Sequence, residues 1–187
     1  INHPLSKYLP EWNDVQVAVP DDSGGYSLEP ARTKITLRHL LTHTGGMSYG
    51  TGPSAAEWQR ANMQGWYFAD RNEPIRETIA RMASLPLDAH PGESWIYGYN
   101  TDILGAVVEV VSGENLADFF ANNIFAPLGM NDTHFYLPAE KRARLATVYR
   151  PKDGGGIEAI PETNGMQSQG LYAEGPQQSY SGGAGLL

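Results

Sequence analysis

The sequence predicts an α+β fold in which helices make up most of residues 1–187. Apolar residues recur at helical spacing from Thr36 to Phe125, whereas strand-forming runs are few and short. The chain has 187 residues, of which 41% are hydrophobic, and this is enough to bury one sizeable core. We therefore expect these residues to belong to one domain.

The first part of the chain is predicted to hold two short helices separated by a loop. Residues 3–9 fit a short helix that Pro10 ends, and residues 11–34 fit an irregular surface loop because they are rich in Asp, Gly and Pro. Thr36 fits the N-cap of the second helix. Its apolar face would be formed by Leu37, Leu40 and Leu41, and its end by Gly45 and Gly46.

Two further helices are expected after a Gly-rich loop at residues 47–53. One runs from Ser54 to about Gln64 and the other from Glu73 to about Ser84. The second has apolar residues at helical spacing, namely Ile75, Ile79 and Met82.

The last predicted helices follow residues 91–105, PGESWIYGYNTDILG, in which a turn leads directly into a helix. That helix runs from Thr101 to Val111, with Asn100 or Thr101 as its N-cap. Another amphipathic helix is marked by Leu116, Phe119, Phe120 and Ile124 and ends at Pro127 and Gly129. Beyond it we expect one or two helical turns at 139–144, a short strand at 146–149, and no core of its own in 151–187.

Charge and composition exclude several classes of partner. The net charge is -8 and the Lys and Arg residues are scattered, so we expect no nucleic-acid partner and no anionic membrane surface. No apolar run reaches the roughly 18 residues that a membrane helix needs, so the sequence predicts a soluble chain without a membrane span. The absence of cysteine excludes disulfides and leaves the compartment, cytoplasmic or periplasmic, open.

The histidines and glycine pairs do not predict a metal or cofactor. His39 and His43 have the i, i+4 spacing of a helical metal site, but the segment lacks the glutamate of His-Glu-x-x-His and no third ligand is suggested. We read them as hydrogen-bonded histidines at a helix–loop corner. The Gly-Gly pairs lack the spacing of phosphate-binding loops, so we expect turns there and no cofactor.

Three stretches resemble signatures of the serine β-lactamase and penicillin-binding-protein superfamily. ITLRHLLTHTGGM at 35–47 is similar to the family's LLTHTSGL, PGESWIYGYN at 91–100 to its Tyr-x-Asn motif, and IFAPLGMNDT at 124–133 to its PLGM-x-DT. They occur in the family's order, and the resemblance is closest to class C β-lactamase-like proteins of the family VIII carboxylesterase branch. It implies a β-lactamase/transpeptidase-like fold, of which this segment is mainly the helical region.

The resemblance implies a serine that attacks an ester or lactam carbonyl while a tyrosine or a nearby lysine takes the proton. A phenol, whose ordinary pKa is about 10, accepts a proton only where a cation lowers that pKa. The family supplies this cation from the lysine of Ser-x-x-Lys. Counting back from the helix that contains Ile103 assigns Tyr97 as the catalytic tyrosine, with Tyr99 in reserve. Without the resemblance, a packing role would be the default for Tyr97.

The tyrosine motif departs from the family pattern, because Tyr99 stands two residues after Tyr97 and Asn100 stands three after it. We predict that Tyr99, Asn100 and Trp95 contact the substrate. The shifted asparagine disfavours a lactamase, since its amide would orient the side-chain amide of a lactam. An ester needs no such contact. The nearby aromatic residues line an acyl pocket or pack in the core, and both readings stay open for Trp58, Trp66, Tyr67 and Phe68.

None of the serines has a lysine three residues later, and no Lys-Thr-Gly motif is present. We therefore expect residues 1–187 to be a single partial domain, an internal segment of a longer hydrolase, and to be inactive alone. The parent protein would act on a small-molecule ester or lactam. A β-lactamase, a D-alanyl carboxypeptidase and a non-catalytic binding module remain alternatives, and the oligomeric state is open.

Overall fold

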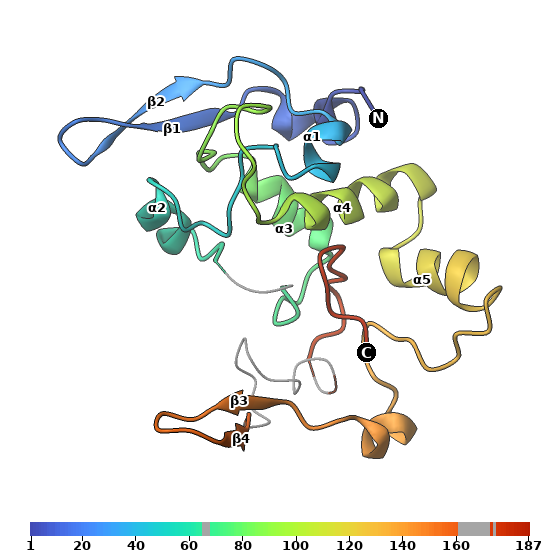
Figure 1. Ribbon diagram of the computed structural model, residues 1–187. Helices are drawn as coiled ribbons and strands as arrows, with labels where there is room; N and C mark the ends of the chain where they lie inside the picture. The colour runs from blue at the N-terminus through green and yellow to red at the C-terminus, as the bar shows by residue number, and fades with distance from the viewer. Residues whose placement is uncertain (65–67, 161–172, 174) are drawn as a thin grey trace.

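The computed structural model describes residues 1–64, 68–160, 173 and 175–187, and more of these residues lie in helices than in strands (Figure 1). The α-helices are α1 (Leu37–Leu41), α2 (Ala55–Arg60), α3 (Ile75–Met82), α4 (Asn100–Ser112) and α5 (Leu116–Phe120). Shorter helical segments are the 3-10 helices Leu5–Lys7, Pro10–Asn13 and Ala139–Arg144 and a π-helical segment, Ala121–Phe125. The strands form two antiparallel hairpins, β1 (Gln16–Pro20) with β2 (Tyr26–Pro30) and β3 (Tyr149–Pro151) with β4 (Ile157–Ala159).

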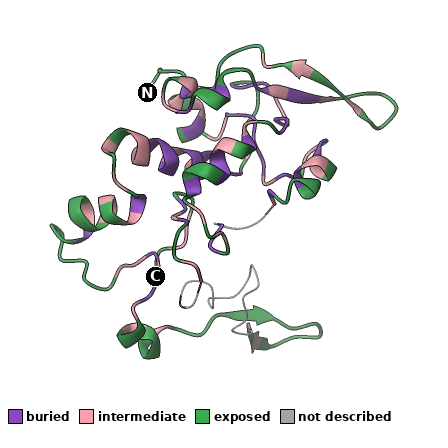
Figure 2. Ribbon diagram, turned by 180° about the vertical axis from the view of Figure 1, so that it is seen from behind, coloured by how far each residue is buried: buried purple, intermediate pink, exposed green. Residues whose placement is uncertain are grey.

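The core lies around α4, which packs against α1, α3 and α5. Buried residues are frequent in α3, α4 and β1, while β3 and β4 are largely exposed (Figure 2). In α3 the predicted apolar face is confirmed, because Ile75, Ile79 and Met82 are fully buried. The helix is held by this face, since most of a short helix's stability comes from packing.

Helix α1 begins as the sequence predicts. Thr36 Oγ1 accepts a hydrogen bond from the backbone N–H of His39 at 3.2 Å, and His39 Nδ1 accepts one from the N–H of Thr36 at 3.3 Å. This reciprocal pair is a capping box, which satisfies two backbone donors at the helix start. The predicted apolar face is correct for the buried Leu40 and wrong for Leu41, which is 56% exposed.

The prediction of an irregular loop at residues 11–34 is wrong, because this region contains the β1–β2 hairpin. Asp21 begins the turn, and its carboxylate accepts hydrogen bonds from the N–H groups of Ser23 and Gly25. Strand β1 is also fixed by a distant segment: the N–H of Ala18 donates to the carbonyl of Leu87 at 2.8 Å. Asp, Gly and Pro therefore mark the turn and the strand ends, and the strands depend on contacts that local composition does not reveal.

The predicted N-cap of α4 is wrong in position. The helix begins at Asn100, and Tyr99 occupies the cap position without a side-chain cap hydrogen bond. The side chain of Asn100 instead donates to backbone carbonyls of the preceding loops. The helix after it is confirmed as α5, although it continues as a π-helical segment rather than as a regular helix.

Two other boundaries differ from the prediction, and one agrees with it. Helix α2 stops at Arg60 rather than near Gln64, because Asn62 has a left-handed backbone with φ of 53°. The strand expected at 146–149 starts only at Tyr149. The helical turns at 139–144 are confirmed as a 3-10 helix. Among the described residues, no helix is both long enough and apolar enough to cross a membrane.

Candidate active site

The two loops that carry the first two motifs lie side by side. One follows α1, and the other connects α3 to α4. Backbone hydrogen bonds join them at three places: Gly92 N–H to the carbonyl of Thr44 at 2.8 Å, Ile96 N–H to that of His43 at 2.8 Å, and Asp88 N–H to that of Gly46 at 2.7 Å. Motifs separated by some fifty residues in the sequence therefore form one structural unit.

Gly98 lets the two loops approach each other closely. A Cβ atom at this position would lie 2.4 Å from the carbonyl carbon of Ser48 and 2.5 Å from the carbonyl oxygen of Met47. Both are backbone atoms, which cannot rotate away as a side chain can. The glycine between the two tyrosines is therefore required by the packing of the turn.

Tyr97 lies on the exposed side of this unit. Its side chain is 55% exposed, and its ring is surrounded by three other aromatic rings. The ring centroid of His43 is 4.8 Å away, that of Tyr49 is 5.8 Å away in an edge arrangement, and that of Trp95 is 6.0 Å away in a stacked one. Tyr97 is thus packed through its ring yet accessible to a small molecule. Trp95 is 67% exposed and also accessible.

Tyr99 and Asn100, which the sequence predicts as substrate contacts, are both fully buried. The hydroxyl of Tyr99 donates to the carbonyl of Met63 at 3.1 Å. Asn100 Nδ2 is 3.3 Å from the carbonyl oxygens of Met47 and Ile96. Their side chains are therefore used to hold the loops together, and neither presents a surface to a ligand in this structure.

The two histidines of the first motif have separate structural roles. His39 completes the cap of α1, whereas the ring of His43 lies between Asn100 and Tyr97. Burial lowers the pKa of both side chains, and in His39 the nearby Arg38 lowers it further. Within the described parts of the chain, no three His, Asp or Glu side chains come close enough to hold a metal ion.

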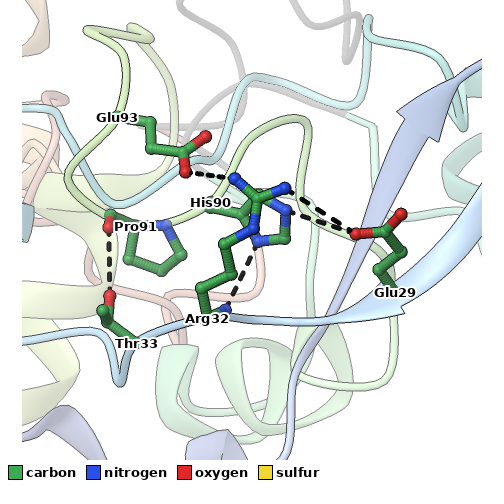
Figure 3. A network of polar contacts seen from close by, with 6 residues as sticks. All are labelled: Glu29, Arg32, Thr33, His90, Pro91 and Glu93. Carbon is green, nitrogen blue, oxygen red and sulfur yellow. Dashed lines mark hydrogen bonds and ion pairs between the residues drawn. The ribbon is translucent and has the colours of Figure 1, made fainter.

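A polar network anchors the turn that precedes Tyr97, as Figure 3 shows. The backbone N–H of Arg32 donates to Nδ1 of the buried His90 at 3.4 Å. The guanidinium of Arg32 donates to the carboxylate of Glu93 at 2.7 Å. The Thr33 hydroxyl donates to the carbonyl of Pro91 at 3.1 Å. An exposed ion pair contributes little alone, but several contacts to one short turn fix its position. Figure 3 labels the six residues of this network, which are Glu29, Arg32, Thr33, His90, Pro91 and Glu93.

The first turn of α4 contains a buried carboxylate that the sequence does not predict. Asp102 is 2% exposed and accepts a 2.5 Å hydrogen bond from the hydroxyl of Ser181. Burial raises the pKa of Asp102 to about 6, although the hydrogen bonds from Ser181 and Gly183 oppose this shift. A Cβ on Gly182 would lie 2.4 Å from the carbonyl oxygen of Thr101. The glycine pair at 182–183 therefore packs closely against the start of α4. The sequence does not predict this contact, because the pair lies far from α4 along the chain.

We expect Asp102→Asn to change how stability depends on pH. Because the pKa of Asp102 is about 6 in the folded protein and 3.8 as its ordinary value, the folded state binds the proton more tightly. The tighter proton binding stabilises the folded state below pH 4, and this stabilisation is lost as the pH rises through 6. The loss amounts to about 3 kcal/mol, at 1.36 kcal/mol for each pKa unit.

Urea unfolding of the full-length protein and the variant at several pH values measures this effect. The stability of the wild type relative to the variant should fall between pH 4 and pH 7, because the contributions of all other groups cancel in the difference. A difference that is constant over this range would contradict the assignment.

Two of the large aromatic residues that follow the first motif, Trp58 and Phe68, belong to the hydrophobic core. Trp58 and Phe68 are 2% and 1% exposed, and both pack against Tyr99, with ring centroids 5.9 and 5.2 Å away. The Trp58 indole N–H donates to the carbonyl of Pro86 at 3.1 Å. Core packing is therefore the correct reading for these two. Trp66 and Tyr67 lie outside the described residues.

Several proteins similar in sequence to this chain are named as esterases or acyltransferases. The lovastatin esterase of Penicillium rubens is 39% identical over 158 residues, which cover 82% of this chain and 38% of that protein. The esterase EstB of Burkholderia gladioli is 33% identical over 198 residues, which cover 100% of this chain and 46% of EstB. The chain spans less than half the length of either relative.

Solved structures agree with these matches. EstCE1, described as a hydrolase with promiscuous acyltransferase activity, has a TM-score of 0.75 and 28% identity, and the match covers 99% of this chain and 48% of EstCE1. The unliganded simvastatin synthase LovD of Aspergillus terreus has a TM-score of 0.70 and 31% identity, with 98% and 43% of the two chains covered. The model of the family described as Beta-lactamase matches residues 1–186. The chain therefore belongs to the beta-lactamase family and has its β-lactamase/transpeptidase-like fold.

Proposed function

We propose that the protein containing these residues is a serine hydrolase that cleaves small carboxylic esters through an acyl-serine intermediate, with Tyr97 as general base. The observation that carries the proposal is the contrast between the two tyrosines of the motif: Tyr97 is 55% exposed at the surface of the turn, whereas Tyr99 is fully buried. Of the two tyrosines, the exposed Tyr97 supports a role that needs access for a substrate and for a second catalytic group.

The proposed reaction follows the chemistry of activated serine nucleophiles. The phenolate of Tyr97 takes the proton of the serine hydroxyl as the serine oxygen bonds to the ester carbonyl carbon. The tetrahedral intermediate then collapses, the bond to the alkoxy oxygen breaks, and the tyrosine returns the proton to the departing alcohol. Water repeats the sequence on the acyl-serine and releases the carboxylic acid. The lysine of a Ser-x-x-Lys motif, absent from residues 1–187, would stabilise the phenolate.

Burial of Asn100 favours an ester over a β-lactam as the substrate. Its amide nitrogen lies 3.3 Å from two backbone carbonyls, so turning it toward a lactam's side chain would leave those carbonyls unpaired. Ester hydrolysis makes no use of that amide. The same intermediate allows acyl transfer when an alcohol replaces water, and EstCE1 is described as a hydrolase with promiscuous acyltransferase activity. Within the superfamily, we place the protein nearest to the family VIII carboxylesterases.

Active-site labelling of the full-length protein tests this proposal. A fluorophosphonate probe should modify one serine outside residues 1–187 that has a lysine three residues later, and modification should abolish hydrolysis of p-nitrophenyl butyrate. Peptide mass spectrometry identifies the serine. The proposal is wrong if the modified serine lies within residues 1–187. It is also wrong if nitrocefin is hydrolysed faster than the ester, which indicates a β-lactamase, or if neither is hydrolysed, which indicates a binding module.

A further inference from the structure

His43 combines an unusual backbone conformation with a position directly beside Tyr97. Its φ angle is 53°, in the left-handed region that few residues with side chains adopt. Its carbonyl accepts the hydrogen bond from Ile96 N–H at 2.8 Å, one residue before Tyr97. The backbone of His43 is thus tied to the tyrosine turn.

The surroundings of Asn100 determine which nitrogen of His43 carries the proton. Asn100 Nδ2 is 3.3 Å from the carbonyl oxygens of Met47 and Ile96 and 3.3 Å from Nδ1 of His43. Carbonyl oxygens only accept hydrogen bonds, so the amide nitrogen, which only donates, must face them. Nδ2 carries two hydrogens for these three acceptors, so His43 Nδ1 shares one of them with a carbonyl. A hydrogen on Nδ1 would point at this donor, and the contact therefore favours the neutral ring with its proton on Nε2.

The ring of His43 also makes the closest of the aromatic contacts around Tyr97. The two ring centroids are 4.8 Å apart with an angle of 38° between the planes. The neighbouring Trp95 meets the His43 ring edge-on at 6.1 Å and stacks on Tyr97 at 6.0 Å. Burial lowers the pKa of His43, which agrees with a neutral ring near pH 7.

We propose that His43 is a positioning residue for Tyr97: Asn100 holds its imidazole as the neutral Nε2–H tautomer, and the imidazole ring holds the phenol in place. The proposal rests on the proposed role of Tyr97 as general base. It assigns no proton transfer to His43. Because the imidazole is neutral, it supplies no positive charge to a phenolate, and that charge has to come from another residue.

Kinetics of the full-length variant His43→Asn test the positioning role. Asparagine adopts the left-handed conformation more readily than most residues and keeps an acceptor oxygen near the place of Nδ1, but it lacks the ring. We expect kcat for p-nitrophenyl butyrate to fall about ten- to a hundredfold, because displacement of a catalytic group by about 1 Å costs up to that much. KM should change little, since the substrate need not contact His43.

A matched control comes from the other histidine of the same motif. His39→Gln keeps the capping box of α1, in which glutamine at the third helical position serves as well as histidine. Its kcat should equal that of the wild type. If His43→Asn is folded and retains wild-type kcat, or if it raises KM rather than lowering kcat, the positioning role is refuted.

Nitrogen NMR of the wild-type protein tests the tautomer without any variant. With 15N-labelled histidine, the two-bond proton–nitrogen correlations of His43 at pH 7 should show an unprotonated Nδ1 and a protonated Nε2. A protonated Nδ1, in a neutral or a charged ring, would overturn the proposal. Failure of the proposed function gives a different pattern, because then Tyr97→Phe retains turnover whatever the state of His43.

Discussion

Replacing Tyr97 by Phe in the full-length protein is expected to remove most ester turnover. General-base assistance is typically worth about a hundred- to ten-thousandfold in rate, so kcat should fall by that factor while KM stays nearly constant. Only the phenol oxygen is lost, and the ring that packs against His43, Tyr49 and Trp95 remains. Steady-state kinetics with p-nitrophenyl butyrate measure the effect, and thermal melts establish that the variant is folded.

Tyr99→Phe is the matched control, because it removes the same atom two residues away. The hydroxyl of Tyr99 donates to the buried carbonyl of Met63, so its loss should cost about 1 kcal/mol of folding stability and leave turnover largely intact. If the two variants behave in the opposite way, Tyr99 is the catalytic tyrosine. If neither lowers kcat, Tyr97 is not the base, the lysine of a Ser-x-x-Lys motif takes that role, and the turn is structural.

The sequence predicts best where short-range signals determine structure. Thr36 caps α1 because its hydroxyl accepts a hydrogen bond from the backbone N–H of His39, only three residues later in the sequence. Helix α3 carries its apolar residues at regular spacing, and the structure buries them. Such features depend on neighbours three or four residues away, which the sequence presents directly.

The features that the sequence does not reveal depend on distant partners. Strand β1 is held by Leu87, and Asp102 is hydrogen-bonded to Ser181, 79 residues later in the chain. Similarly, Asn100 is a good N-cap by its residue type, but its side-chain amide donates hydrogen bonds to the backbone carbonyls of Met47 and Ile96, in two loops that pack against it. A single sequence gives no means to pair these positions.

The candidate site was predictable in part. The motifs locate the turn and favour Tyr97 over Tyr99 by their distance from the helix. They do not reveal that Tyr99 and Asn100 are buried, because burial follows from how the first motif packs on the second. The role proposed for His43 was hidden for the same reason, since its ring contacts residues more than fifty positions later.

Gly98→Ala is expected to have the second-largest effect, on both activity and stability. The new Cβ would lie 2.4 Å from the carbonyl carbon of Ser48 and 2.5 Å from the carbonyl oxygen of Met47, well inside normal contact distance. Because both atoms belong to the backbone, the two loops must separate, and Tyr97 must move with them. Overpacking of this kind costs about 1–3 kcal/mol. Displacement of a catalytic group by about 1 Å should lower kcat about a hundredfold.

The matched control is Gly113→Ala, the same substitution at the other end of α4. Gly113 has φ of 76° and no atom within 4 Å of the added methyl group, so the cost is backbone strain of about 1–2 kcal/mol without a collision. That variant should therefore lose stability but keep its turnover, whereas Gly98→Ala should lose both. Thermal melts and steady-state kinetics on the two full-length variants separate these effects. Wild-type kcat in folded Gly98→Ala would show that the loops tolerate separation and that Tyr97 does not depend on their contact.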